Sequence, residues 1–272
     1  MGLQQKLKEI DTLKNKIDSF GELSDAIKKK INYKFRLDWN YYSNRMEGGT
    51  LTRQETRGVM VGNITVDGKP IKDVMEMNGH DQVVLEVLRM GQGEARISES
   101  RIKEIHKAII SVVDNPEATK LVGNWKETPN EIVNYKGEKF DFVAPKEVPD
   151  AIHDLLNKTN AALDKVEVDK KDAKHPLFIA CDFHLDYVAI HPFFDGNGRT
   201  ARILFNTILI ACGYPPVIIN DIEKDKYYRI LGDIQAYGGN PDLFYEQIAS
   251  LLIQSLNLVI DAAEGREIEE KD

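Results

Sequence analysis

Apolar residues recur along most of this chain at intervals of three and four, the spacing of one face of an α-helix. The first 47 residues carry two such stripes, which are separated at Phe20-Gly21 and stop at Gly48-Gly49, a typical helix C-terminus. We therefore predict two long N-terminal helices. Their apolar positions are Leu3, Leu7, Ile10, Leu13 and Ile17 in the first helix, and Ile27, Ile31, Phe35, Trp39, Tyr42 and Met46 in the second.

The helical pattern continues through most of the remaining sequence. Residues 203–211 are apolar nearly all round, which predicts a buried central helix. Its polar residue Asn206 is either a satisfied core amide or a group in a pocket. Further helices are predicted from Thr52 to about Val61, Met77 to Arg89, Ser98 (the N-cap) to Val113, Val148 to Leu163, Pro176 to Ile190, Tyr227 onward, and Phe244 to Ile260.

Residues 122–148 have a different pattern. Glycine and proline separate short runs of β-branched and aromatic residues, which predicts two short strands in a hairpin. The apolar positions are Trp125, Ile132, Val133, Tyr135, Phe140 and Phe142. We therefore expect an all-α protein with a helical core and a small β-hairpin, organised as an N-terminal helical region (1–95), a second domain (96–260) and an acidic tail (261–272).

Composition is ordinary for a globular protein of one large domain or two coupled ones, with 42% hydrophobic and 29% charged residues. The net charge of −8 argues against general binding to nucleic acid or to an anionic membrane. Met1–Ile10 lacks the apolar core of a signal peptide, and the apolar runs near 203–212 and 248–260 have polar breaks and are too short to span a bilayer. Cys181 and Cys212 lie in apolar helical runs, so we expect no disulfide framework and a cytoplasmic location.

Candidate chemistry is concentrated in the segment from His191 to Arg202. His191 offers a base near neutral pH, and Asp195 offers a hard oxygen ligand for Mg²⁺. The turn Gly196-Asn197-Gly198 lets backbone N–H groups approach a phosphate, and a helix starts at the same point. Arg199 and Arg202 then lie on one face of the first helical turn. The helix dipole disfavours cations there, so two arginines indicate a bound anion.

The other histidines carry less information. His80 and His106 lie on helical patterns, and neither has a second histidine or a cysteine at metal-ligand spacing. We therefore expect packed or solvated side chains at both positions. His184 lies one heptad before His191 and is predicted to belong to the core or to support the site from behind.

The segment His191-Pro-Phe-Phe-Asp-Gly-Asn-Gly-Arg-Thr-Ala-Arg202 matches the HPFx[D/E]GNGRxxR signature and so resembles the Fic-domain family. The similarity extends to residues 175–177 and 213–216 and covers the chain from about Ile31 to about Ile253. It implies the Fic fold and the transfer of AMP from ATP to a Tyr, Ser or Thr hydroxyl of a target protein. His191 would take the hydroxyl proton, Asp195 would hold Mg²⁺, and pyrophosphate would leave. The implied phosphate-binding residues are Asp195, Gly196, Asn197, Gly198, Arg199, Thr200, Ala201 and Arg202.

Further roles follow from the resemblance. Ser43-Asn44-Arg45-Met46-Glu47-Gly48 matches the [S/T]xxxE[G/N] inhibitory motif, which implies that Glu47 pairs with Arg202 and blocks the γ-phosphate. A carboxylate in the last helical turn opposes the helix dipole, and an arginine partner would compensate for it. The hairpin matches the flap, where Ile132 and Val133 would clamp the target as an added strand. Lys126 departs from the arginine more common in the family. Tyr227 would lie against the adenine, and Gln235 replaces an asparagine near the nucleotide.

Other functions remain open at this stage. Glu47 could instead orient a water that removes AMP, so the enzyme could run in reverse or in both directions. Transfer of a different phosphate-containing group is a weaker alternative, and a nucleotide-binding regulatory or toxin–antitoxin module without enzymatic activity is a third. With Glu47 in place we expect low resting activity, limited to self-modification. Expected partners are ATP and a target protein, with no nucleic acid and no membrane, while a homodimer is allowed.

Overall fold

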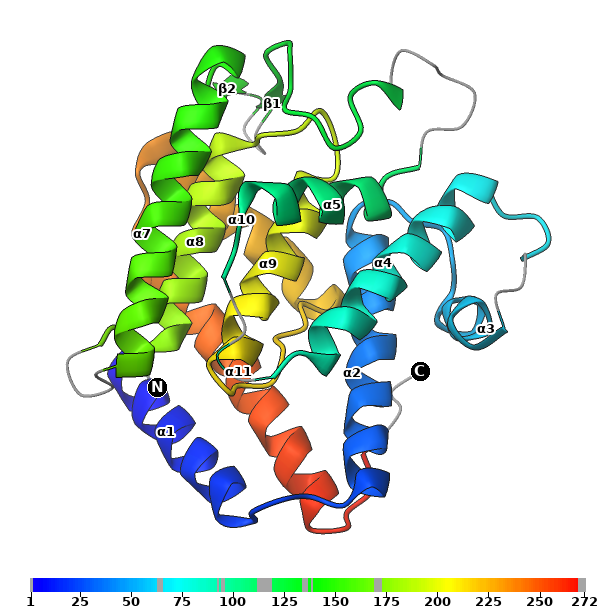
Figure 1. Cartoon of the computed structure of the whole chain (residues 1–272), viewed down its shortest axis with the longest axis vertical. Helices are drawn as coiled ribbons and strands as arrows, with labels where there is room; N and C mark the ends of the chain where they lie inside the picture. Colours follow the sequence, from blue (N-terminus) through cyan, green and yellow to red (C-terminus); the bar gives the residue numbers. More distant parts are fainter. Residues whose placement is uncertain are drawn as a thin grey trace.

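The computed structural model describes residues 2–62, 66–91, 93, 96–111, 119–133, 137, 139–168 and 173–268 (Figure 1). It is almost entirely helical, as predicted. The helices are α1 (Leu3–Ser19), α2 (Asp25–Met46), α3 (Arg53–Gly62), α4 (Ile71–Arg89), α5 (Glu99–Ile109), α7 (Val148–Val168), α8 (Pro176–Ile190), α9 (Asn197–Ala211), α10 (Asp221–Tyr237) and α11 (Asp242–Ala263). A short 3₁₀ turn, η1 (Pro145–Glu147), precedes α7.

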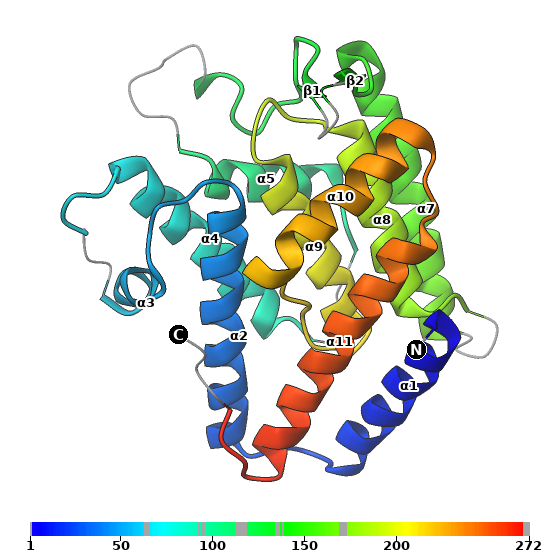
Figure 2. The ribbon, with the colours of Figure 1, turned by 180° about the vertical axis from the view of Figure 1, so that it is seen from behind.

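Helix α9 lies at the centre of the fold. Nearly every residue from Asn197 to Ala211 is buried, which confirms the predicted central helix. Helices α2, α4, α5 and α8 all contact it, and Figures 1 and 2 show them arranged around it. Asn206 is a satisfied core amide, because it donates to the Val217 carbonyl (3.0 Å) and accepts from the Val217 N–H (2.8 Å).

The helices before residue 96 belong to the same apolar core as those after it. Ile10 of α1, Trp39 of α2 and Val84 of α4 all lie in the core cluster that includes the buried face of α9. Helix α4 crosses α5 closely at Gly79, where an added Cβ would lie 1.6 Å from the carbonyl oxygen of Ala108. Helices α4 and α5, which both contact α9, are therefore held close together by a direct backbone contact.

Helix α11 is long and apolar enough to span a membrane by length and composition alone. In the structure it packs against α1, α8, α10 and α2, and 56% of its most apolar window is buried inside the protein. Its apolar residues are accounted for by this packing.

Two short paired strands confirm the predicted hairpin. Strand β1 (Glu131–Val133) pairs antiparallel with β2 (Lys139–Asp141), and Ile132 lies opposite Phe140. Tyr135 and the side chains of Ile132 and Val133 lie outside the described part of the structure.

Helix α5 ends at Ile109, earlier than the predicted Val113, because Ile110 adopts an extended conformation (φ −107°, ψ 124°). Val113 itself lies outside the described residues.

Candidate functional site

The functional segment joins two buried helices through a tight loop. Helix α8 ends at Ile190, and His191 adopts a left-handed conformation (φ 51°), the single non-glycine residue with positive φ in the described part of the chain. Such a conformation is strained for a residue with a Cβ, and strain of this kind is characteristic of functional sites. Gly196 (φ 72°) then caps α9; a Cβ at this position would lie 2.6 Å from Cδ1 of Ile110.

Two side chains hold this loop from the inside. Asn197 accepts a hydrogen bond from the Phe193 N–H (2.9 Å) and donates to the Phe193 carbonyl (2.8 Å). His106 accepts from the Gly123 N–H at Nδ1 (2.8 Å), so its Nε2–H donates to the Asp195 carbonyl (3.0 Å). The His106 ring also stacks on Phe193, with centroids 3.7 Å apart. Burial lowers the pKa of His106 to about 4, so the ring is neutral at pH 7.

His106 was expected to be a packed or solvated histidine, and it is fully buried. Its contact with the loop could not be found from sequence, because the two residues lie 89 positions apart and no local pattern links them.

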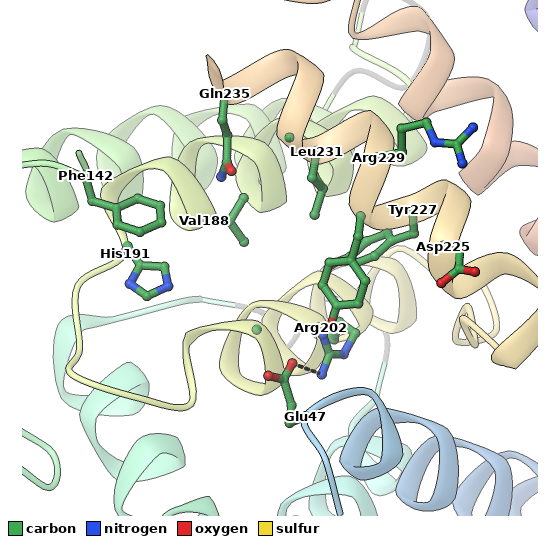
Figure 3. A pocket seen from close by; sticks show the side chains of 13 residues that line it. Glu47, Phe142, Val188, His191, Arg202, Asp225, Tyr227, Arg229, Leu231 and Gln235 are labelled. Atoms are coloured by element: carbon green, nitrogen blue, oxygen red, sulfur yellow. Dashed lines mark hydrogen bonds and ion pairs between the residues drawn. The ribbon is translucent and has the colours of Figure 1, made fainter. Parts of the chain in front are cut away.

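A cavity of about 560 Å³ opens at the start of α9 (Figure 3). Its wall brings together six of the predicted site residues, which are Glu47, His191, Gly198, Arg202, Tyr227 and Gln235. Apolar side chains, including Phe142, Val188 and Leu231, complete the wall. Figure 3 shows His191 on one side of this cavity and the Arg202–Glu47 pair on another.

His191 is held by neighbours on two sides. Its Nδ1 lies 2.8 Å from Nδ2 of Asn130 and 3.0 Å from Nδ2 of Asn197. Its ring stacks on Phe142, with centroids 3.9 Å apart and planes 13° apart. Burial, together with the charge of Lys126, lowers the pKa of His191 to about 4. The imidazole is therefore neutral at pH 7 and oriented within the cavity.

Glu47 and Arg202 form the predicted ion pair. Glu47 is the C-cap of α2, and its Oε1 accepts from Nη2 of Arg202 at 2.7 Å. Ser43 contributes two further acceptors to the same guanidinium, through Oγ (3.1 Å to Nε) and its carbonyl (3.0 Å to Nη2). Burial alone would lower the pKa of Arg202, but the carboxylate of Glu47 keeps it above its ordinary value. The unfavourable position of Glu47 at a helix C-terminus is thus compensated by an arginine.

One donor of this arginine has no hydrogen-bond partner among the residues that the structure describes. Arg202 is 5% exposed, and this donor is its buried Nη1. A Cβ on Gly198 would lie 3.1 Å from this Nη1 and 2.4 Å from Oε1 of Glu47. The absence of a side chain at Gly198 therefore leaves room for the pair.

Arg199, the other arginine predicted to bind the anion, pairs with a carboxylate in this structure. Its Nη1 donates to Oε2 of Glu76 on α4 (2.5 Å) and to the Ile109 carbonyl (3.2 Å), and the residue is 4% exposed. It lines a second cavity of about 200 Å³ and is absent from the wall of the first. No local sequence pattern pointed to Glu76, whose carboxylate pairs with Arg199.

Two other predicted phosphate-binding residues lie in the core. Thr200 and Ala201 are fully buried and do not line the main cavity. The backbone N–H of Thr200 donates to the Gly196 carbonyl (3.0 Å), so in this conformation it is committed to the helix.

The two tyrosines of α10 differ in exposure. Tyr227 is 1% exposed, and its hydroxyl lies 2.7 Å from Nε2 of His184, which accounts for the buried histidine predicted to support the site. Tyr228, which the sequence did not single out, is 40% exposed and donates to the Met46 carbonyl at 3.3 Å. Of the two aromatic rings, Tyr228 offers more surface to a ligand.

Asp195, the predicted magnesium ligand, lines the second cavity. Its Oδ1 accepts from the Gly196 N–H (2.6 Å), and it lines the second cavity together with Glu47, Asp73 and Glu76. In the part of the chain that the structure covers, no group of three or more His, Cys, Asp or Glu side chains forms a metal site by itself. This donor set fits Mg²⁺, which proteins usually bind through one or two carboxylates and substrate phosphates.

Comparison with known proteins identifies the fold and its motif. A model of the Fic/DOC family matches residues 96–209. The crystal structure of a Fic-domain-containing signaling protein from Bacteroides thetaiotaomicron is 33% identical, with a TM-score of 0.85, and the match covers 97% of this chain and 100% of that chain. The present chain belongs to the Fic/DOC family. The all-α Fic fold expected from the sequence is thereby confirmed.

Relatives of this Fic protein include larger proteins. The protein adenylyltransferase Fic of Nematostella vectensis is 32% identical over 240 residues, which make up 86% of this chain and 52% of that protein. A fragment of Fic-1 from C. elegans has the same fold, with 24% identity and a TM-score of 0.77 over 96% of this chain and 74% of that chain. The chain spans about half the length of the curated relatives it matches.

Proposed function

We propose that this Fic protein transfers AMP from ATP to a hydroxyl side chain of a target protein, and that Glu47 restrains the reaction. The observation that carries the proposal is that the larger cavity at the start of α9 has in its wall both a neutral imidazole, His191, and a buried guanidinium, Arg202. Several relatives of similar sequence are named protein adenylyltransferase Fic.

The cavity has one end suited to an anion. The unpartnered Nη1 of Arg202 lies beside Gly198, in the first turn of α9, where helix N–H groups and the positive dipole end favour phosphate. A buried donor without an acceptor is costly, so a phosphate oxygen that accepts from Nη1 would be stabilising. The exposed ring of Tyr228, the apolar Leu231 and the amide of Gln235 line another part of the wall, and these groups suit a nucleoside.

In the proposed reaction, the hydroxyl oxygen of the target attacks the α-phosphorus of ATP. A new P–O bond forms, the bond between the α-phosphorus and the bridging oxygen breaks, and pyrophosphate leaves with that oxygen. His191 accepts the hydroxyl proton and later returns it to water. The N–H groups at the start of α9 stabilise the charge that develops on the phosphate oxygens.

We further propose that Asp195 holds Mg²⁺ together with phosphate oxygens of the bound nucleotide. The metal would neutralise phosphate charge, which is its general contribution in phosphoryl and nucleotidyl transfer. The flap strand β1 would receive the target backbone as an added strand, a mode of recognition that tolerates many sequences.

Glu47 would compete with the nucleotide for Arg202. Its carboxylate already accepts from Nη2 and lies where a Cβ on Gly198 would be, so it adds a negative charge beside the proposed phosphate position. We therefore infer low resting activity, relieved when Glu47 is removed or displaced.

The test uses purified protein with ATP labelled at the α- or the γ-phosphate, comparing wild type, Glu47→Gly and His191→Ala. AMP transfer predicts that the α label becomes attached to protein, that attachment increases in Glu47→Gly, and that it disappears in the double variant with His191→Ala. Attachment of the γ label would indicate transfer of a different group. Tight ATP binding without attachment to any protein would contradict an enzymatic function. Release of AMP from a modified target, lost in Glu47→Gly, would assign the reverse reaction.

A further inference from the structure

The amide of Asn130 can have only one orientation. Its Oδ1 lies 2.7 Å from Nζ of Lys126, which is always a donor in its ammonium form. Its Nδ2 lies 2.9 Å from the Phe193 carbonyl, which is always an acceptor. These two partners independently place the NH₂ group on the side of His191, where it donates to Nδ1 at 2.8 Å.

The amide of Asn197 is fixed in the same way. Its Oδ1 accepts from the Phe193 N–H, so its Nδ2 faces the Phe193 carbonyl and Nδ1 of His191 (3.0 Å). Nδ1 of His191 therefore faces two donors whose orientation other groups determine. It must carry a lone pair, and the proton of the neutral ring must be on Nε2.

This tautomer is unsuited to the proposed reaction. Nδ1 is committed to the two amides, so Nε2 is the nitrogen left for the cavity that His191 lines. A protonated Nε2 in a neutral ring donates a hydrogen bond and has no lone pair with which to accept a hydroxyl proton.

We propose that Asn130 is a positioning residue, held in place by Lys126, that keeps His191 in the Nε2–H tautomer until the flap moves. When the Asn130 amide turns, its oxygen can accept from Nδ1–H, and Asn197 is then the one donor of the pair still opposite Nδ1. Exchange with water can then leave the lone pair on Nε2. This inference deepens the proposed AMP transfer and rests on it for its functional consequence, because it adds a restraint on the base to the restraint that Glu47 places on Arg202.

The two ends of the flap hairpin contact the ring of His191, so a movement of the flap can reach the base. Asn130 directly precedes β1, and Phe142, which stacks on His191, directly follows β2. Lys126 belongs to the same cluster and is 3% exposed. Its side-chain Nζ lies 5.6 Å from the centre of the Phe142 ring, and its backbone N–H donates to the Pro192 carbonyl (2.8 Å). Both ends of the hairpin thus contact the ring of His191 or the residues that hold it, so a target strand added to β1 acts on the base.

The tautomer can be observed directly. Nitrogen-15 chemical shifts of the His191 ring, assigned by comparison with His191→Ala, distinguish a protonated from an unprotonated nitrogen at pH 7. In wild type we expect Nε2 protonated and Nδ1 unprotonated. A wild-type ring with its proton on Nδ1 would overturn the proposal, whatever the enzyme does with ATP.

Asn130→Asp provides the matched perturbation. A carboxylate of the same shape can accept from both Lys126 and Nδ1–H. A hydrogen bond to a charged acceptor is stronger than the one from the remaining neutral donor, Asn197, so the variant should move the ring proton to Nδ1. Asn124→Asp is the control, because it adds the same charge to the same segment at an exposed side chain bonded to the Lys120 carbonyl. It should leave the His191 shifts unchanged. If Asn130→Asp does not fold, Asn130→Ala removes one of the two donors to Nδ1 and should yield a measurable Nδ1–H fraction; an unchanged tautomer in the variant that folds would contradict the proposal.

Activity gives a second readout. Because general-base transfer typically contributes about 10²–10⁴-fold, Asn130→Asp in the Glu47→Gly background should increase AMP transfer by about tenfold or more. A decrease or no change, despite a shifted tautomer, would show that the tautomer does not limit the base. Absence of transfer in Glu47→Gly and in every variant would contradict the proposed function, while the chemical shifts would still decide the position of the proton.

Discussion

The ion pair between Arg199 and Glu76 provides a quantitative test of how α9 is anchored. The two groups are 2.5 Å apart, with side chains 4% and 10% exposed, and they join the first turn of α9 to α4. In Glu76→Ala the guanidinium remains buried and keeps its hydrogen bond to the Ile109 carbonyl. Removing one member of a buried pair leaves an uncompensated charge, which costs about 3–5 kcal/mol.

A loss of this size is large compared with the whole free energy of unfolding of a domain. Domains are stable by about 5–15 kcal/mol, so Glu76→Ala should remove at least about a fifth of the free energy of unfolding. Glu76→Gln keeps an acceptor but not the charge, and we expect a smaller loss of about 1–3 kcal/mol. Urea titration, followed by circular dichroism, measures both values from the midpoint and the slope.

The surface pair of Lys158 and Asp186 is the matched control. Its atoms are 2.8 Å apart, but the side chains are 62% and 46% exposed. Water screens such a pair, so Asp186→Ala should change the free energy of unfolding by less than about 1 kcal/mol. If Glu76→Ala costs no more than Asp186→Ala, burial does not determine the strength of the Arg199 contact, and the reasoning is wrong.

Two further predictions concern packing and pH. Gly79→Ala should destabilise the protein by at least about 2 kcal/mol in the same titration, because the new Cβ would overlap the Ala108 carbonyl and overpacking typically costs about 1–3 kcal/mol or more. Gly232→Ala, within α10 and with open space around it, should instead stabilise by about 0.5–1 kcal/mol. Burial lowers the pKa of His106 and His191 to about 4, so the unfolded chain binds more protons between pH 6.5 and 4. Stability should therefore be complete above pH 6.5 and fall on acidification through that window, by about 1.4 kcal/mol per pH unit for each histidine, as stability measured at a series of pH values would show.

The sequence was most informative about features that depend on residues within one short segment. The apolar stripes, the hairpin and the start of α9 follow from spacing within one segment, and the structure confirms them. The contact between Glu47 and Arg202 spans 155 positions and was expected only through the resemblance to a family. The partner of Arg199 could not be predicted from sequence, since helical spacing places two arginines near one another but does not reveal a carboxylate such as Glu76 on another helix. The contact of Asn130 with His191 was not predicted for the same reason, because in sequence Asn130 is an ordinary polar residue before a strand.

The two proposed restraints act on different atoms, and this leads to a last prediction. Glu47 acts on Arg202, the anion-binding end of the cavity, while Asn130 acts on Nδ1 of His191. No hydrogen bond in the described part of the structure joins the two groups, although the charge of Glu47 reaches His191 and raises its pKa against the dominant effect of burial. The effects of two independent restraints on the reaction rate should multiply, because their contributions to the activation free energy add.

The prediction is tested by the rate of α-label transfer in wild type, Glu47→Gly, Asn130→Asp and the double variant. The ratio of rates produced by Asn130→Asp should be the same, within about twofold, whether Glu47 is present or absent, since sites without shared partners are additive within about 0.3–0.5 kcal/mol. If Asn130→Asp increases the rate only when Glu47 is absent, occupancy of the phosphate site controls the base, and the two restraints are steps of one switch. If it increases the rate equally in both backgrounds, the flap and the N-terminal glutamate are separate controls on the same reaction.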